Sequence, residues 1–123
     1  MHVANEVDPR SIRGRAGEDA TLSVYRQRGF RLLHRNWRCR VGELDLVLSR
    51  NGLIVFCEVK TRSGSAFGGG YEAVTRSKRR KLLQLAALYL SSKAPPHDRV
   101  RFDVGSVWLG RGAPDVEIFE DAF

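Results

Sequence analysis

Two apolar segments separated by the dipeptide Asn51-Gly52 constrain this chain more than any other feature of its sequence. The segments cover residues 41–49 and 53–60, and side chains that alternate in polarity are typical of half-buried strands. Asn-Gly favours the two-residue turn of a β-hairpin. A shift of one residue would move every apolar side chain to the opposite face, so we expect the register of this hairpin to be strongly specified.

The two faces of the predicted hairpin differ in polarity. One face is wholly apolar, which assigns it to the core; it carries Leu44, Leu46, Leu48, Leu53, Val55, Cys57 and Val59. The other face is apolar near the turn and charged at its open end, where we expect Asp45 opposite Glu58 and Glu43 opposite Lys60. Facing Cβ atoms lie about 4.5–5.5 Å apart, and like charges at this spacing repel. A divalent cation would remove the conflict, and Mg²⁺ suits it because Mg²⁺ binds one or two carboxylates and keeps several waters.

A solvated face with ordinary ion pairs is the alternative interpretation. It accounts for Glu43 and Lys60 as a cross-strand salt bridge that stabilises the fold by at most ~1 kcal/mol. It does not account for Asp45 facing Glu58, or for charges at the ends of strands otherwise rich in Leu, Ile, Val and Phe. The hairpin therefore predicts a metal site, beside which the Lys60 ammonium would orient an attacking water and stabilise charge developing on a phosphate.

The chain is basic, with 21 Lys and Arg against 14 Asp and Glu and a formal net charge of +7. Such a charge favours a polyanionic partner through phosphate contacts and counterion release. Because 17 of the 21 basic residues are Arg, the coding composition of the genome explains the excess equally well. The candidate nucleic-acid contacts are Arg62, Arg76, Lys78, Arg79, Arg80 and Lys81, for which an ordinary solvated helix face is the alternative.

The remaining elements follow from periodicity and from capping and turn residues. We expect a flexible tail over 1–10 and a single domain over 11–123. Helices are predicted from Ser11 to about Arg28 and from Glu72 to about Lys93. Strands are predicted over 30–38, 41–49, 53–60, 100–109 and 115–119, with a Gly/Ser-rich loop over 61–70. The apolar side of the first helix is predicted to contain Ala16, Ala20, Leu22, Val24 and Tyr25, and that of the second Leu82, Leu83, Leu85, Ala86, Tyr89 and Leu90. The order α-β-β-β-α-β-(β) permits a parallel crossover after the hairpin, and it predicts an α/β fold with a mixed sheet, a helix on each face and three layers.

The sequence also indicates a compartment. Cys39 and Cys57 form no CxxC motif and have no His-rich neighbourhood, which argues against zinc and fits a reducing cytosol. No apolar run approaches the ~20 residues of a membrane-spanning helix, and the first residues lack a signal-peptide core. We therefore expect a cytoplasmic protein without a membrane partner.

Several segments together carry a resemblance to a known family. They are GRAGEDA (14–20), GFRLLHRNWRCRVGELDLV (29–47), LIVFCEVKTR (53–62), FGGGYEAV (67–74), RFDV (101–104) and DAF (121–123). With them the chain resembles the YraN-like family of small bacterial proteins, which is placed in the PD-(D/E)xK nuclease superfamily near the Holliday-junction resolvases. The resemblance implies a restriction-endonuclease-like fold.

The resemblance also implies roles for particular residues. Asp45 and Glu58 would bind Mg²⁺ or Mn²⁺ with the carbonyl of Val59, and Lys60 would position or activate water. Glu18 would support the metal shell, although by itself it can also be explained as an acid favoured by the helix dipole. Glu43 is an additional acid beside this set.

The function that follows is a divalent-metal-dependent endonuclease acting on DNA rather than RNA, with branched or recombination-type DNA among its substrates. A homodimer follows only by analogy with the resolvases. Two alternatives stay open, since fold does not fix function. One is a non-catalytic nucleic-acid-binding module that retains the motif for structure. The other is an adaptor whose basic body and acidic end, with four acids from Arg111 to Phe123, contact other proteins.

Overall fold

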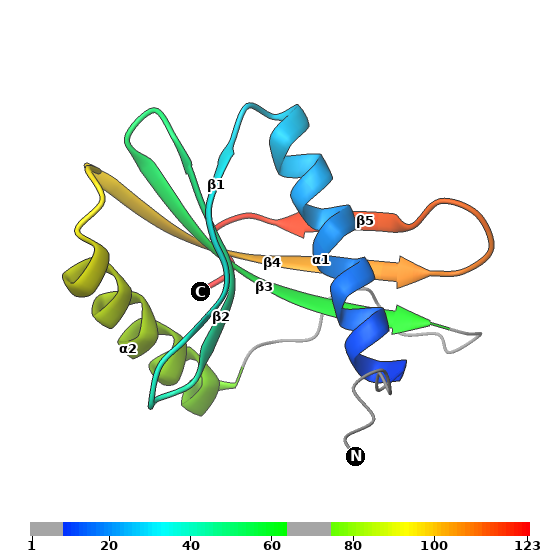
Figure 1. Ribbon diagram of the computed structural model, residues 1–123, viewed down its shortest axis with the longest axis horizontal. Helices are drawn as coiled ribbons and strands as arrows, with labels where there is room; N and C mark the ends of the chain where they lie inside the picture. Colours follow the sequence, from blue (N-terminus) through cyan, green and yellow to red (C-terminus); the bar gives the residue numbers. More distant parts are fainter. Residues whose placement is uncertain (1–8, 64–74) are drawn as a thin grey trace, which may run out of the picture.

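The computed structural model describes residues 9–63 and 75–123 of the chain. Its elements follow the predicted order (Figure 1): α1 (Pro9–Gln27), β1 (Arg31–Arg38), β2 (Glu43–Arg50), β3 (Leu53–Ser63), α2 (Arg76–Lys93), β4 (Arg99–Leu109) and β5 (Asp115–Phe119). The α/β class is confirmed, and so is the fifth strand.

The five strands form one mixed sheet in the order β1-β2-β3-β4-β5. β3 and β4 are parallel and are connected through α2, whereas the other neighbouring pairs are antiparallel. This is the strand-helix-strand crossover that the sequence predicts after the hairpin.

The β2–β3 turn has the geometry that its residues favour. Asn51 and Gly52 have φ values of 48° and 81°, and a two-residue hairpin turn of this kind requires positive φ at both central positions. Paired residues run from Arg50 and Leu53 at the turn to Leu46 and Cys57, in the predicted register. The ladder ends there, and the two strands separate beyond it (Figure 1).

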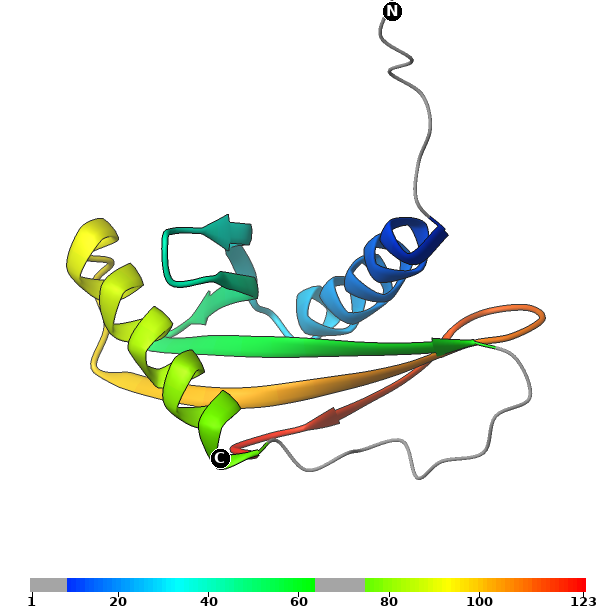
Figure 2. The ribbon, with the colours of Figure 1, turned by 90° about the horizontal axis from the view of Figure 1, so that it is seen from below.

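Two apolar clusters lie on opposite faces of the sheet, which gives the three predicted layers. The α1 cluster joins Leu22 and Tyr25 to Leu46, Leu48, Leu53, Val55 and Cys57. The α2 cluster joins Leu82, Leu85, Ala86 and Tyr89 to Leu44, Val47, Ile54, Phe56 and Val104. Figure 2 shows α1 lying along one side of β3 and β4.

Both helix starts differ from the prediction. α1 begins at Pro9 rather than Ser11, because proline has the φ of a first helical residue and needs no N–H partner there. Residues 9 and 10 are thus helical, and the rest of the predicted tail lies outside the described residues. α2 begins at Arg76 rather than Glu72, and the Thr75 side chain caps it by accepting a hydrogen bond from the backbone N–H of Lys78. Residues 61–63 extend β3, and the remainder of the predicted loop is outside the described ranges.

Three predicted burial patterns are also wrong in detail. The side of α1 that faces the sheet carries Gly17, Thr21, Leu22 and Tyr25, while Ala16, Ala20 and Val24 are half-buried. Leu83 of α2 is 50% exposed. Leu44 packs in the α2 cluster with Val47 rather than beside Leu46 and Leu48. No helix in the described ranges is long and apolar enough to span a membrane.

Candidate metal centre

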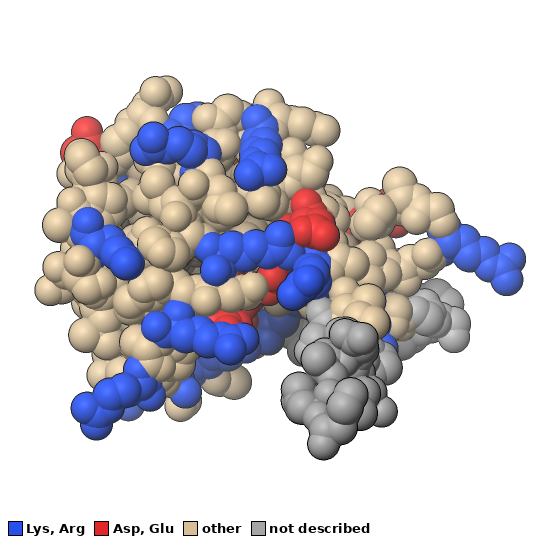
Figure 3. Space-filling view, viewed as in Figure 1, with Lys and Arg blue, Asp and Glu red and all other residues tan. Residues whose placement is uncertain are grey.

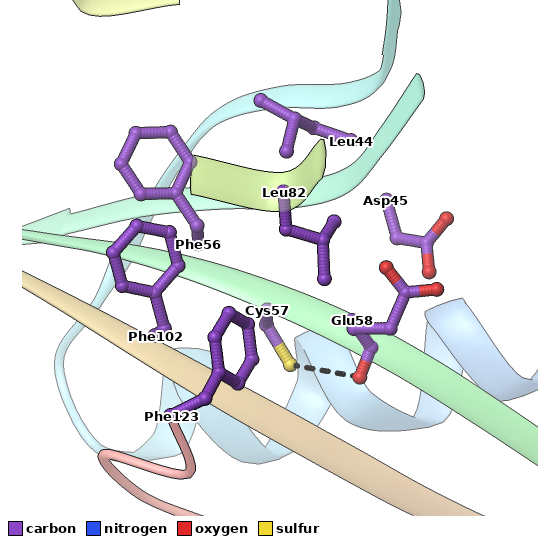
Figure 4. Close-up of a pocket in the computed structure, with 8 residues that line it drawn as sticks. All are labelled: Leu44, Asp45, Phe56, Cys57, Glu58, Leu82, Phe102 and Phe123. Atoms are coloured by element: carbon purple, nitrogen blue, oxygen red, sulfur yellow. Dashed lines mark hydrogen bonds between the residues drawn. The ribbon is translucent and has the colours of Figure 1, made fainter. Parts of the chain in front are cut away.

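Asp45 and Glu58 lie together at the point where β2 and β3 separate. Their carboxylates point toward one another in Figure 4, although the two residues are one step beyond the last ladder pair. The backbone N–H of Val59 donates a hydrogen bond of 2.8 Å to Oδ2 of Asp45. The Asp45 side chain thus takes the place of a strand partner for β3.

The surroundings of Asp45 disfavour its negative charge. Burial and the charge of Glu58 raise the pKa of Asp45 to about 7, with smaller contributions from Glu18 and Glu43, while the Val59 hydrogen bond acts in the opposite direction. A bound cation would favour the ionised form of Asp45. The donor set therefore fits Mg²⁺ or Mn²⁺.

Apolar side chains close the inner side of the carboxylate pair. A small cavity of about 10 Å³ lies beside the pair (Figure 4). Besides Asp45 and Glu58, it is lined by Leu44, Phe56, Cys57, Leu82, Phe102 and Phe123. This volume is close to the least that holds one water molecule. The pair therefore faces low-dielectric surroundings on this side, where charge interactions are stronger than in water.

In the described ranges, no group of three or more His, Cys, Asp or Glu side chains converges as a metal cage. Two carboxylates are sufficient for Mg²⁺, which usually keeps several waters and completes its shell with substrate phosphates. The arrangement fits a metal that is held in part by its substrate.

Glu43 and Lys60, which the sequence predicts to face one another, both lie beyond the last ladder pair of β2 and β3. Glu43 lies opposite Arg38 of β1, whose guanidinium donates a hydrogen bond to its carboxylate. Lys60 is half-buried opposite Ser106 of β4. The described β2–β3 ladder therefore does not include the predicted pairing of these two residues.

Glu18 is fixed by two residues of β1 that the sequence analysis did not single out. Its Oε1 accepts from Nε of Arg35, and its Oε2 accepts from Nδ2 of Asn36, both at 3.0 Å. Arg35 also donates to Asp19 and to the carbonyl of Arg15, which ties β1 to α1. Polar residues in the middle of a predicted strand were the available signal, but their partner depends on how α1 docks.

The helix-dipole explanation of Glu18 does not hold. α1 begins at Pro9, so Glu18 lies well past the first turn, to which the dipole effect is confined. Its charge instead contributes to the raised pKa of Asp45. Glu18 thus belongs to the electrostatic surroundings of the pair.

Lys78 contacts the carboxylate pair from α2. Its Nζ lies 3.6 Å from Oε1 of Glu58. Burial acts to lower the pKa of Lys78, but the charges of Glu58 and Asp45 outweigh it, and the pKa is raised. From the sequence alone, Lys78 is predicted only as a phosphate contact.

Two clefts flank the pair and share Glu43. One, of about 170 Å³, is lined by Gly42, Glu43, Glu58, Lys78, Lys81, Leu82 and Leu85. The other, of about 250 Å³, is lined by Gly14, Arg15, Glu18, Asn36, Arg38 and Glu43. Figure 3 shows acidic side chains in the middle of this face with Lys and Arg around them. Among the predicted nucleic-acid contacts, Arg76, Arg79, Arg80 and Lys81 are exposed, and Arg62 is half-buried on β3.

The fold and the site define an α/β domain with an open mixed sheet and a carboxylate pair at a divergent hairpin. Residues 17–107 match the family described as "Uncharacterised protein family UPF0102". The chain is 43% identical over 116 residues to a UPF0102 protein of Moorella thermoacetica, covering 93% of this chain and 97% of that protein. UPF0102 proteins of Clavibacter michiganensis and Dictyoglomus thermophilum are 44% and 38% identical, each over 89% of this chain and 93% and 95% of their own length. The chain belongs to the UPF0102 family.

Proposed function

We propose that this protein is a divalent-metal-dependent endonuclease that hydrolyses phosphodiester bonds in DNA, branched or recombination-type DNA included. The observation that carries the proposal is the adjacency of Asp45 and Glu58 where β2 and β3 separate, with the pKa of Asp45 raised to about 7 by burial and by Glu58. An ordinary structural pair would not place two carboxylates together in a half-buried position, because like charges destabilise a strand pair.

Each residue of the pair has a distinct part in holding the ion. Glu58 and Asp45 would supply the anionic ligands, and the carbonyl of Val59 would supply the neutral one. The Val59 N–H holds Asp45 at Oδ2, so the side chain is oriented before the ion arrives. A bound Mg²⁺ or Mn²⁺ would supply a Lewis acid for the scissile phosphate and lower the pKa of a bound water.

Lys60 follows Glu58 by two positions on β3, and side chains two positions apart on a strand share a face. Its ammonium is thereby placed to orient the attacking water and to stabilise charge developing on the phosphate. Glu18, held at both oxygens by Arg35 and Asn36, has lone pairs left to accept a hydrogen bond from a water beside the ion.

The charge distribution supports a polyanionic substrate. The net charge is +7, and Lys and Arg surround the acidic centre on the face in Figure 3. DNA rather than RNA, and a homodimer on branched DNA, are proposed from the superfamily resemblance alone.

A cleavage assay with a panel of substrates tests the function. Linear, single-stranded, flapped and four-way DNA are incubated with Mg²⁺ or Mn²⁺ and the wild-type protein, with Asp45→Ala, and with Asp115→Ala as a matched control on the exposed start of β5. We expect cleavage by the wild type and Asp115→Ala and none by Asp45→Ala.

Other outcomes have distinct meanings. Cleavage that survives Asp45→Ala would point to a contaminating nuclease and overturn the assignment. Salt-sensitive DNA binding without cleavage of any substrate would favour the non-catalytic module, and no such binding would favour the adaptor.

A further inference from the structure

The ammonium of Lys78 lies beside the carboxylate of Glu58, one of the two proposed metal ligands. The backbone of Lys78 is fixed in the first turn of α2, where its N–H donates to the Thr75 side chain at 3.1 Å. Its ammonium reaches from there to within 3.6 Å of Oε1 of Glu58. The contact joins α2 to β3 across the edge of the 170 Å³ cleft.

The two partners differ in their freedom to move. The Glu58 side chain is only 15% exposed, whereas that of Lys78 is 39% exposed. A half-buried carboxylate beside a second acid needs a counter-charge when no metal is bound. Lysine suits a temporary role, because its compact charge sits on a flexible four-carbon stem.

An ammonium and a divalent cation at the same carboxylate repel each other. A metal ion that binds Glu58 therefore displaces Lys78, and the adjacent cleft, which Lys81 also lines, offers a place for a phosphate that the displaced ammonium can contact. The metal and the phosphodiester would thus both favour the Lys78 side chain in its displaced position, away from Glu58.

We propose that Lys78 is a mobile counter-ion that couples the two binding events: it neutralises Glu58 in the metal-free protein and moves to a substrate phosphate when the ion binds. The inference rests on the proposed function and adds its regulation. Metal binding is then weak without nucleic acid and stronger with it, and by linkage the metal strengthens nucleic-acid binding by the same factor.

Titration calorimetry tests this coupling without a cleavage readout. Mn²⁺ is titrated into the full-length protein alone and into its complex with a four-way DNA junction made with hydrolysis-resistant phosphorothioate linkages. The variants are Lys78→Gln, the charge-retaining Lys78→Arg, and Lys93→Gln, which removes the same charge from an exposed position in the last turn of the same helix.

We expect Lys78→Gln alone to bind Mn²⁺ about two- to fivefold more tightly than the wild type, the range that loss of a partly exposed ion pair allows. The junction should strengthen its Mn²⁺ binding less than it strengthens that of the wild type, while Lys78→Arg and Lys93→Gln stay close to the wild type. Equal Mn²⁺ affinity for Lys78→Gln and the wild type, or an equal gain in Lys93→Gln, would overturn the counter-ion role and leave the nuclease proposal standing. An absence of Mn²⁺ binding in every protein, with and without the junction, would overturn both.

Discussion

The Asp45 side chain experiences opposing influences whose balance determines its chemistry. The hydrogen bond from Val59 N–H favours the ionised carboxylate, while burial and Glu58 disfavour it and raise its pKa to about 7. One backbone hydrogen bond is thus outweighed by partial burial and a neighbouring charge. This residue therefore both organises the end of the hairpin and supplies a candidate metal ligand.

Lys60 provides a second test at the residue scale. A catalytic role and a purely structural role of Lys60 predict different effects of Lys60→Ala on cleavage rate and on stability. If its ammonium acts on developing charge, single-turnover cleavage should fall by about 10²–10³-fold, as for comparable electrostatic groups. Mn²⁺ and DNA affinities should be largely retained. A structural ion pair would instead cost at most ~1 kcal/mol of unfolding free energy, with no specific loss of rate.

Lys93→Ala is the matched control, because Lys93 is an exposed lysine in the last turn of α2. Its cleavage rate should equal that of the wild type. A well-folded Lys60→Ala protein that cleaves at the wild-type rate would remove Lys60 from the proposed mechanism and leave Asp45 and Glu58 to be tested separately.

At the scale of elements, two glycines of α1 have opposite effects. A Cβ at Gly17 would lie 1.9 Å from Oγ1 of Thr61 on β3, whereas a Cβ at Gly14 would meet nothing within 4 Å. Gly17 is therefore needed for the close approach of α1 to the sheet. Gly14 only lowers the helix propensity of its segment.

We predict that Gly17→Ala lowers the unfolding free energy by about 1–3 kcal/mol, the usual cost of overpacking. Gly14→Ala should raise it by up to about 1 kcal/mol, because alanine is the better helix former. Urea unfolding with comparison of m-values measures both. Equal effects of the two substitutions would contradict the described packing of α1 on β3.

The start of α2 gives a prediction about polyanion binding. Arg79, Arg80 and Lys81 are exposed, and each phosphate contact contributes about 0.9 to the slope of log affinity against log salt on duplex DNA. Replacing all three with Gln should reduce the slope by up to about 2.7 if each contacts a phosphate. Fluorescence anisotropy with a DNA duplex at several salt concentrations measures it.

The matched control for this face is Arg99→Gln, at the start of β4, where Arg99 contacts Asp98 and the carbonyl of Asn51 near the hairpin turn. Its slope should stay at the wild-type value. If the triple variant has an unchanged slope of log affinity against log salt, the exposed face of α2 is an ordinary solvated helix face that does not contact phosphates.

At the scale of the whole molecule, local patterns predicted more than long-range contacts. Asn51-Gly52 predicted the register from Arg50 and Leu53 onward, because turn geometry and alternation specify the same pairing. The period of α2 predicted its buried face except at Leu83, which lies at the margin of that face. The α/β order with a parallel crossover followed from the succession of elements.

Contacts between distant segments were not predictable from one sequence. Asp103 is fully buried and accepts from Tyr25 of α1 at 2.6 Å and from the backbone of Asp121. No local pattern relates these segments, because each contact depends on the docking of α1 and on the return of the chain after β5. The hydrogen bonds from Arg35 and Asn36 to Glu18 could not be predicted for the same reason.

The acid pair links the stability of the whole domain to pH. In the folded protein the pKa of Asp45 is raised from 3.8 to about 7, so the folded state binds this proton more tightly than the unfolded state. Protonation of Asp45 therefore stabilises the folded state fully at pH values below the pKa that Asp45 has in the unfolded chain. This stabilisation is lost as the pH rises through about 7. The metal-free domain should be less stable at pH 8 than Asp45→Asn, whose amide oxygen can still accept from Val59 N–H.

A metal ion should restore that lost stability, because it binds the ionised pair in the folded hairpin and has no such site in the unfolded chain. At ten times its dissociation constant, Mn²⁺ should add about 1.4 kcal/mol of unfolding free energy, which raises the Tm of a domain of this size by roughly 5 °C. Since protons compete for Asp45, the shift should be larger at pH 8 than at pH 6. Differential scanning calorimetry of the wild type, Asp45→Asn and the control Asp115→Asn at both pH values measures it. Asp115→Asn should respond as the wild type does and Asp45→Asn should not respond, whereas a wild-type Tm unaffected by millimolar Mn²⁺ at pH 8 would rule out a metal site at this pair in the free protein.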